Sequence, residues 1–198
     1  MTKPVIITKQ MIDDAAVSMV KKSGLDALTA RNIASKLHCS TQPIYKTYAN
    51  MDELRKSTVS TLADYVIQRI VTYRKTGCAY LDSGLGYIHF AGTERVLFQL
   101  FCISDKNHHL LHINIENDTI RALMEQEVAH LPLSILKKDK IFLKTMIFTH
   151  GLAVLAYGAQ LKRTEDEIAI LLQEAFESYI TQEMEEKNCA YSSSWRQS

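Results

Sequence analysis

Apolar residues recur at intervals of three and four along almost all of this sequence, and this spacing is the period of an α-helix. Between residues 8 and 23 they form a single stripe of Met11, Ile12, Ala15, Ala16, Met19 and Val20. Glycine and proline, which interrupt strands and form turns, number only 7 and 3 among 198 residues. Because an all-β chain needs many turns, the sequence predicts an all-α fold.

Capping residues and helix breakers divide the chain into expected helices. These cover residues 8–23, 29–37, 41–47, 50–73, 85–91, 94–103, 116–131, 140–161 and 165–186. The expected N-caps are Thr8, Thr29, Ser40 and Asn50, the last in a capping box with Glu53. Gly24 suits a helix end, residues 77–86 are expected to be a connection, residues 104–109 a polar loop, and residues 188–198 a frayed tail.

Composition narrows the class of protein. The formal net charge is +1, but residues 1–60 carry +4 and residues 61–198 carry −3. The four cysteines (39, 78, 102 and 189) are far apart, which indicates reduced thiols rather than disulfides or a zinc site. The N-terminus does not resemble a signal peptide, and residues 145–161 fall short of a clean membrane span. We therefore expect a soluble cytoplasmic protein with no membrane partner.

Residues 29–47 follow the helix-turn-helix layout, in which the second helix reads DNA with a polar surface and packs with an apolar one. Ile44 and Tyr48 are expected to face the core. Gln42 can offer a bidentate amide to adenine, and Tyr45 and Lys46 can reach phosphates. The expected contacts with double-stranded DNA are Thr29, Arg31, Ser40, Thr41, Gln42, Pro43, Tyr45, Lys46 and Thr47. A solvated connector in a helical bundle is the alternative reading of this segment.

The segment LTARNIASKLHCSTQPIYKTYANMDEL (28–54) resembles the DNA-binding signature of TetR/AcrR-family transcriptional regulators. The resemblance covers roughly residues 6–55, and weaker likenesses occur at 87–101 and 148–158. It implies an all-α homodimer with an N-terminal DNA-binding domain (1–52) and a larger helical domain (53–187). That second domain would bind a small-molecule effector and dimerise through its last two long helices.

Two residues depart from the family pattern. His38 stands where a glycine is usual in the turn, and a left-handed histidine implies strain of about 1 kcal/mol. Met51, followed by two acidic residues, stands where a lysine is usual at the start of the next helix. Its presence removes one expected phosphate contact, for which Lys46 could compensate.

Two sets of residues carry the expectations for the second domain. Guided by the resemblance, we expect an effector pocket lined by Tyr87, Phe90, Phe98, Phe101, Met124 and Phe148, although such residues also build ordinary cores. Small residues near position 151 allow close helix approach, which favours a symmetric dimer. The expected dimer interface comprises Gly151, Leu152, Leu155, Ala159, Leu172, Phe176 and Tyr179.

These features predict a ligand-responsive regulator that acts as a repressor. It would bind a pseudo-palindromic operator as a dimer and be released from it by the effector. No cofactor, metal or catalytic residue is expected, because the sequence lacks a Ser/His/Asp order, a phosphate loop and an H-E-x-x-H motif. One alternative is a small helical enzyme or zinc protein that uses His108, His109, His112 and Glu116; isolated His89 and His150 are more typical of hydrogen-bonded core residues. Another is a DNA-binding regulator without an effector.

Overall fold

The computed structural model of the chain describes residues 6–103 and 118–185. These residues form helices, with no strand among them, which confirms the all-α prediction. In chain order the helices are α1 (Lys9–Ser23), α2 (Ala30–Lys36), α3 (Gln42–Thr47), α4 (Met51–Val71), α5 (Ala79–Thr93), α6 (Arg95–Phe98), α7 (Asp118–Glu127), α8 (Ile135–Tyr157) and α9 (Glu165–Glu185). A 3₁₀ turn, η1 (Leu25–Ala27), and a π-helical turn, η2 (Gln99–Ile103), complete the set.

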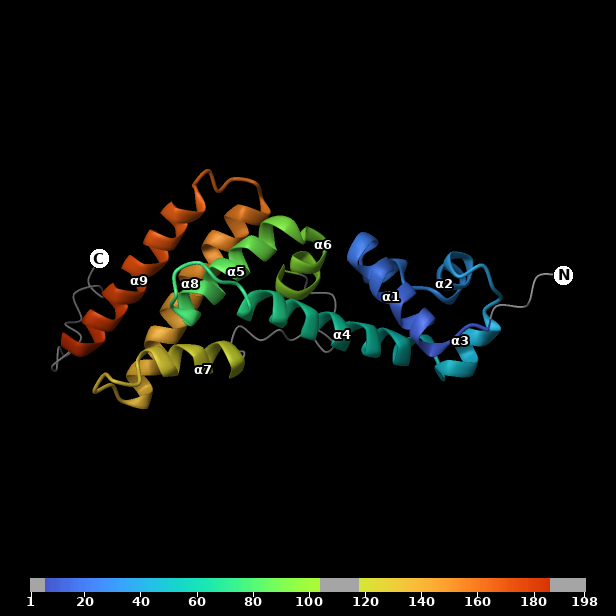
Figure 1. Cartoon of the computed structure of the whole chain (residues 1–198), viewed down its shortest axis with the longest axis horizontal. Coiled ribbons are helices and arrows are strands. Elements are labelled where there is room, and N and C mark those ends of the chain that lie inside the picture. The colour runs from blue at the N-terminus through green and yellow to red at the C-terminus, as the bar shows by residue number, and fades with distance from the viewer. Residues whose placement is uncertain (1–5, 104–117, 186–198) are drawn as a thin grey trace, which may run out of the picture.

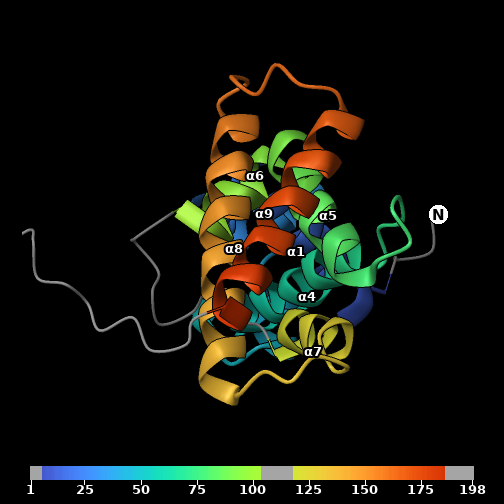
Figure 2. The same ribbon diagram turned by 90° about the vertical axis from the view of Figure 1, so that its left-hand side faces the viewer.

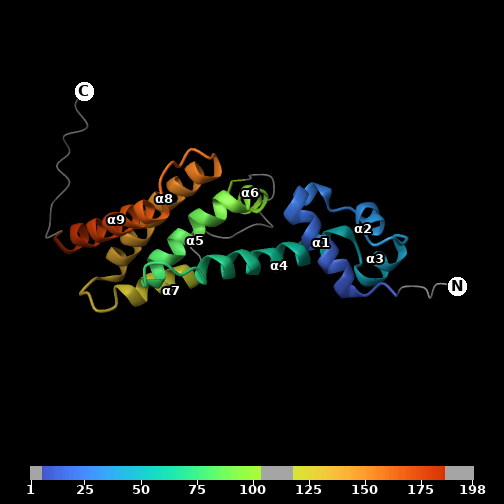
Figure 3. The ribbon, with the colours of Figure 1, turned by 45° about the horizontal axis from the view of Figure 1, so that its top comes forward.

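The molecule is elongated, with α1, α2 and α3 gathered at one end (Figure 1). The long helix α4 leads from this head into a bundle of α5, α7, α8 and α9, and α6 lies between the bundle and α1. Helix α5 is the centre of the bundle, because it packs on α4, α7, α8 and α9. Helices α8 and α9 lie side by side at the end farthest from the head (Figures 2 and 3).

Three of the four predicted N-caps are confirmed. The hydroxyl oxygens of Thr8 and Thr29 accept hydrogen bonds from the backbone N–H groups three residues later. The side-chain oxygen of Asn50 accepts from the Glu53 N–H at 2.9 Å, and the Glu53 carboxylate accepts from the Ala49 N–H at 2.7 Å. These bonds satisfy backbone donors that a helix leaves unpaired at its start, and so fix where α1, α2 and α4 begin.

The predicted cap at Ser40 is wrong. Helix α3 begins at Gln42, and its N-cap is Thr41, whose side chain makes no capping hydrogen bond. The Thr41 backbone is already helical (φ −73°, ψ −13°), so its hydroxyl is not placed to accept from the first turn. Pro43 lies in that first turn, where its missing N–H costs nothing, as predicted.

The predicted connection over residues 77–86 is also wrong, because α5 already begins at Ala79. Glycine disfavours a helix, but here Gly86 allows α5 to cross α4 at close range. A Cβ atom at Gly86 would lie 2.6 Å from the Ile70 carbonyl oxygen and 2.8 Å from the Tyr73 Cβ. Tertiary packing therefore selects glycine inside this helix.

The substitution Gly86→Ala is expected to lower the free energy of unfolding by about 1–3 kcal/mol, because the added methyl group meets backbone that cannot move aside. Gly92→Ala in the same helix is the matched control, since its added Cβ would meet nothing closer than 4.0 Å. Urea unfolding of both variants gives the two values. Equal stability of the two variants would contradict the close crossing of α4 and α5.

Helix α8 begins at Ile135 rather than at Lys140, because Ser134 caps it, and it ends at Tyr157. One face of α8 is exposed in the protomer. On that face Leu136, Leu143 and Ile147 are 75%, 52% and 63% exposed. In the described part of the chain, α8 alone has the length and apolar composition that a membrane span needs, properties that core helices share.

A buried carboxylate joins α8 to α9. The Glu183 side chain is fully buried, and the Lys144 ammonium donates to it at 2.7 Å, while the Lys140 nitrogen lies 3.6 Å away. Burial by itself raises the pKa of the Glu183 carboxyl, but the hydrogen bond and charge of Lys144, with those of Lys140, outweigh burial and lower it. Glu183 is therefore ionised in the folded protein.

This lowered pKa gives stability a defined dependence on pH. The contribution of Glu183 is complete above the ordinary carboxyl pKa of 4.5 and is lost as pH falls through the lower folded-state pKa. Glu183→Gln is expected to cost about 2 kcal/mol of unfolding free energy at pH 7, and the deficit should shrink below pH 4.5. Denaturant titrations at several pH values test this, with Glu177→Gln, an exposed position on α9, as control. A deficit independent of pH would contradict the proposed ion pair.

Candidate nucleic-acid interface

Helix α3 has a polar exposed surface and an apolar buried one. Ile44 is fully buried and Tyr48 is 4% exposed, so both face the core as predicted. The residues on the opposite side are exposed: Ser40, Thr41, Gln42, Tyr45 and Lys46. Tyr45 is 52% exposed, so its ring and hydroxyl are open to a ligand. The surface therefore offers amide, hydroxyl and ammonium groups together.

The remaining predicted contact residues have different surroundings. Arg31 is exposed on α2, whereas Thr29, Pro43 and Thr47 are half-buried. The Thr29 hydroxyl oxygen already accepts from the Asn32 N–H at 3.2 Å, and the Thr47 hydroxyl donates to the Pro43 carbonyl at 2.9 Å. These two hydroxyls thus stabilise the start of α2 and the end of α3. A ligand that bound either hydroxyl would have to share it with this internal hydrogen bond.

The turn between α2 and α3 has the backbone that its sequence suggested. His38 has a φ of +52°, the left-handed region that glycine adopts most easily. Its N–H donates to the Ser35 carbonyl at 3.2 Å, and the Cys39 N–H donates to the Ala34 carbonyl at 3.0 Å. The hydrogen bonds hold the turn with histidine in place, so the departure from glycine leaves the layout intact.

Met51, the second departure, is half-buried and packs against the core at the start of α4. It therefore has a packing role there. In the next turn of α4 the Arg55 guanidinium donates to the Leu28 carbonyl at 3.4 Å and pairs with Asp52 at 3.1 Å. This arginine ties α4 to the connection that precedes α2.

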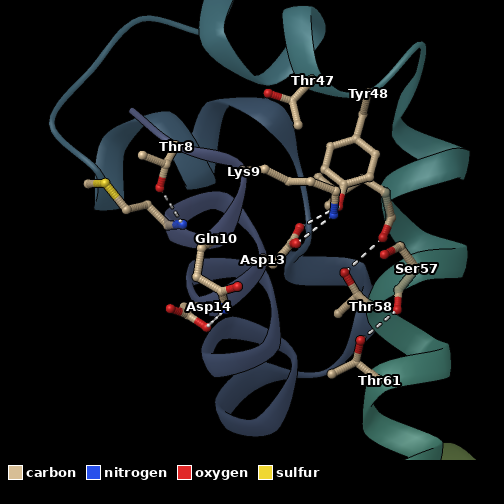
Figure 4. Close-up of polar contacts among 12 residues, drawn as sticks. Thr8, Lys9, Gln10, Asp13, Asp14, Thr47, Tyr48, Ser57, Thr58 and Thr61 are labelled. Atoms are coloured by element: carbon tan, nitrogen blue, oxygen red, sulfur yellow. Dashed lines mark hydrogen bonds and ion pairs between the residues drawn. The ribbon is translucent and has the colours of Figure 1, made fainter. Parts of the chain in front are cut away.

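A polar cluster fixes the end of α3 on the start of α1 (Figure 4). The Lys9 ammonium donates to the Asp13 carboxylate and to the Tyr48 hydroxyl oxygen, both at 2.7 Å, and the Tyr48 hydroxyl donates to Asp13. The hydrogen bonds to Asp13 and Tyr48 hold the pKa of the Lys9 amine well above its usual range. Because Tyr48 follows α3 directly, the cluster orients the exposed surface of that helix.

Tyr48→Phe is expected to lower the unfolding free energy by about 1–2 kcal/mol, since the ring remains buried but the charged hydrogen bond to Asp13 is lost. Tyr45→Phe removes the same hydroxyl from an exposed ring three residues earlier, and should change stability by less than about 0.5 kcal/mol. Thermal and urea unfolding compare the two variants. A Tyr48→Phe protein as stable as Tyr45→Phe would show that the cluster does not hold α3.

The residues predicted to line an effector pocket are closely packed. Four of the six are nearly fully buried, with exposures from 0% to 6%: Phe90, Phe98, Phe101 and Met124. Tyr87 and Phe148 are half-buried. The Phe98 ring lies within 6.2 Å, centroid to centroid, of the rings of Tyr87, Phe90, His150 and Tyr157. A cleft of about 300 Å³ lies elsewhere, between α4 and α5, and shares only Phe90 with this set.

The five histidines considered above as metal ligands or core residues fall into three groups. His108, His109, His112 and Glu116 lie outside the described residues. His150 is half-buried, its Nδ1 lies 2.9 Å from the Tyr87 hydroxyl, and burial lowers its pKa, as a core histidine would show. His89 is exposed, so the expectation of a core histidine is wrong there. In residues 6–103 and 118–185 no three His, Cys, Asp or Glu side chains are grouped as metal ligands.

The predicted dimer residues divide by exposure. Gly151, Leu155 and Ala159 are exposed and Tyr179 is half-buried. Leu152, Leu172 and Phe176 are 9%, 1% and 4% exposed, so they belong to the core of a single protomer. Gly151 also belongs to a set of exposed residues that follow a spacing of seven, four, four and three along α8, here called the α8 stripe, whose other members were not predicted: Leu136, Leu143, Ile147, Gly151 and Val154.

Neither a known protein-family profile nor a curated protein matches the chain by sequence. Solved structures do match its fold. A TetR-like transcriptional regulator from Rhodococcus sp. RHA1 aligns over 91% of this chain and 99% of its own, with 17% identity and a TM-score of 0.59. A TetR-family protein from Vibrio parahaemolyticus aligns over 85% and 96%, with 12% identity and a TM-score of 0.61. At such low identities the likeness establishes the fold.

Proposed function

From its fold, which is that of TetR-family transcriptional regulators, we propose that this chain is a DNA-binding regulator of transcription. The observation that carries the proposal is the exposed surface of α3, where Gln42, Tyr45 and Lys46 lie outward over a fully buried Ile44. A short helix with this division of its surfaces fits the major groove, where amides read bases and cations meet phosphates. In this proposal the protein acts in the cytoplasm. It binds DNA rather than catalysing a reaction, and it needs no cofactor.

We propose further that the protein acts as a homodimer. The α8 stripe supports this, because leucine and isoleucine side chains are exposed there on a helix that faces outward from the end of the molecule (Figure 2). A Cβ atom added at Gly151 would meet no atom within 4 Å, so the centre of the stripe has room for another helix. A second copy of the chain, related by a twofold axis, would cover both stripes at once.

Two heads in a dimer would place two α3 helices in successive major grooves of a pseudo-palindromic operator, about 34–36 Å apart or a little more. A dimer seated on a promoter blocks transcription, so we propose repression as the outcome. A small-molecule effector would release the operator if it bound better to a dimer with a different head spacing. Helix α4 is the element that would transmit such a change, since it runs unbroken from the head into the bundle.

Fluorescence anisotropy with the DNA upstream of the protein's own gene tests the function. At about 150 mM salt, where non-specific electrostatic binding is damped, the protein should prefer one segment over a scrambled duplex by about 10³-fold or more. Equal weak binding to every upstream segment and to the scrambled duplex would contradict regulation of its own promoter. Light scattering of the same sample reports the dimer, and a monomer at micromolar concentration would contradict it.

A further inference from the structure

A cleft of about 300 Å³ opens between the last turns of α4 and the middle of α5. Gly86 lies at its base, where the two helices are closest. From that crossing the walls are formed by Arg69, Tyr73 and Arg74 on one side and by His89 and Phe90 on the other. The volume is at the lower limit of ligand pockets in proteins, and suits a molecule of one ring and a short substituent.

The lining combines positive charge with aromatic rings. Two of its side chains are guanidinium groups, and none of the described side chains that line it is acidic. The Arg74 guanidinium is held in place, because one of its nitrogens donates to the Val71 carbonyl at 2.7 Å and to the Tyr73 carbonyl at 2.5 Å. The rings of Tyr73 and His89 pack together with centroids 5.7 Å apart. A planar anion therefore finds both a charge partner and aromatic side chains in the lining of the cleft.

We propose that this cleft binds a small aromatic carboxylate. Arginine matches the planar geometry of a carboxylate and can form two parallel hydrogen bonds to it, which favours this group over a spherical anion. The ring of the ligand would lie against Tyr73 and His89, above the buried side chain of Phe90. A cation-lined cleft also raises the local concentration of anions, because its walls concentrate the positive field.

The cleft lies one helical turn from a link to the head. Tyr65 precedes Arg69 by four residues on α4, and its hydroxyl donates to the Glu94 carboxylate at the end of α5 at 2.6 Å. The Lys21 ammonium, in the last turn of α1, lies 3.6 Å from the centroid of the Tyr65 ring. Helix α1 also contacts α6, which follows Glu94 directly. The same two helices that form the cleft are therefore joined to the DNA-binding head beside it.

The position of the cleft assigns it a regulatory role, a step that rests on the proposed function. A ligand that contacts both α4 and α5 fixes their separation one turn from the bond between Tyr65 and Glu94. That bond in turn places the ring over which Lys21 lies. If the ligand binds with different affinity to two conformations of the protein that differ in the position of the head, occupancy of the cleft changes the affinity for DNA.

Titration calorimetry on the full chain, with no DNA present, tests the site. Benzoate and phenylacetate are the probes, benzamide is the neutral isostere, and inorganic phosphate is the anion without a ring. The carboxylates should bind, benzamide and phosphate should bind at least about tenfold more weakly, and Arg69→Gln or Arg74→Gln should weaken carboxylate binding about tenfold or more. Arg163→Gln, which removes an exposed arginine paired with Glu167, is the matched control and should bind as the native chain does.

Absence of carboxylate binding, or binding that the cleft arginines do not affect, would overturn the proposal. Phosphate binding as tight as benzoate binding would overturn the requirement for an aromatic ring. Thermal unfolding of each variant shows that it is folded before it is titrated. None of these outcomes depends on DNA. The proposal of a carboxylate site can therefore fail while the proposed DNA-binding function stands, and the DNA-binding function can fail while the carboxylate site stands.

A second measurement tests the regulatory role. Saturating benzoate should change the affinity of the native chain for its operator about fivefold or more. Tyr65→Phe, which loses the hydrogen bond to Glu94 but lies outside the cleft, should bind benzoate normally and show less than about half of that change in binding free energy. An undiminished response in Tyr65→Phe would overturn the coupling through this tyrosine.

Discussion

The double substitution Gln42→Ala and Tyr45→Ala is expected to lower affinity for the operator about 100-fold or more while leaving the fold stable. Both side chains are exposed on α3, so their removal leaves no cavity and breaks no buried hydrogen bond. The amide would be lost from a base edge and the phenol from a phosphate. The expected loss is the sum of two contacts at the centre of a small interface. Anisotropy titrations against specific and scrambled duplexes measure it.

The control for this variant is Gln173→Ala, which removes an exposed amide from α9, where the side chain donates to Glu177 at 2.8 Å. Its operator affinity should equal that of the native chain. The loss in the α3 variant should be larger toward the operator than toward the scrambled duplex, because both duplexes lose the phosphate contact of Tyr45 but only the operator loses the base contact of Gln42. If the α3 variant binds the operator as tightly as the control does, α3 does not recognise the operator sequence.

The double substitution Leu143→Lys and Ile147→Lys is expected to convert the proposed dimer into a monomer. These side chains are 52% and 63% exposed in one protomer, so the lysines are tolerated there. At a twofold interface the four added charges would face one another without water, which should weaken association about 1000-fold or more. Sedimentation equilibrium at micromolar concentration measures the change. The monomer should also lose most of its operator affinity, because two linked heads bind far more tightly than one.

Ile6→Lys serves as the matched control, because Ile6 is 82% exposed and precedes α1, a helix of the head, which lies at the opposite end of the molecule from α8. It should remain dimeric. If the stripe variant sediments as the native chain does, the α8 stripe is not the dimer interface, whatever the oligomeric state of the native chain.

The parts that sequence predicted well are those that local chemistry decides. Thr8, Thr29 and Asn50 cap helices because their side chains reach backbone groups three residues away. Ile44 and Tyr48 face the core because a short helix with one apolar side has only one way to bury it. These interactions act within a few residues, so the sequence contains all that is needed to identify them.

The parts that it missed depend on neighbours that are distant in sequence. Gly86 looks like a turn residue until Ile70 is seen opposite it. Leu172 and Phe176 have the periodicity of an interface, but α5 covers them within the same protomer. The cleft is another such feature, because Arg69 and His89 come together only where α4 and α5 cross. No spacing within either helix indicates that meeting.

The most direct test of DNA recognition is selection from a library of random duplexes with the purified full chain at about 150 mM salt, followed by sequencing. The predicted result is one enriched motif made of two inverted half-sites, with centres about one helical turn apart or a little more, as a twofold dimer with two α3 helices requires. The α3 double variant should fail to enrich it. Failure of the native chain to enrich any motif would contradict the central claim that this protein reads DNA sequence.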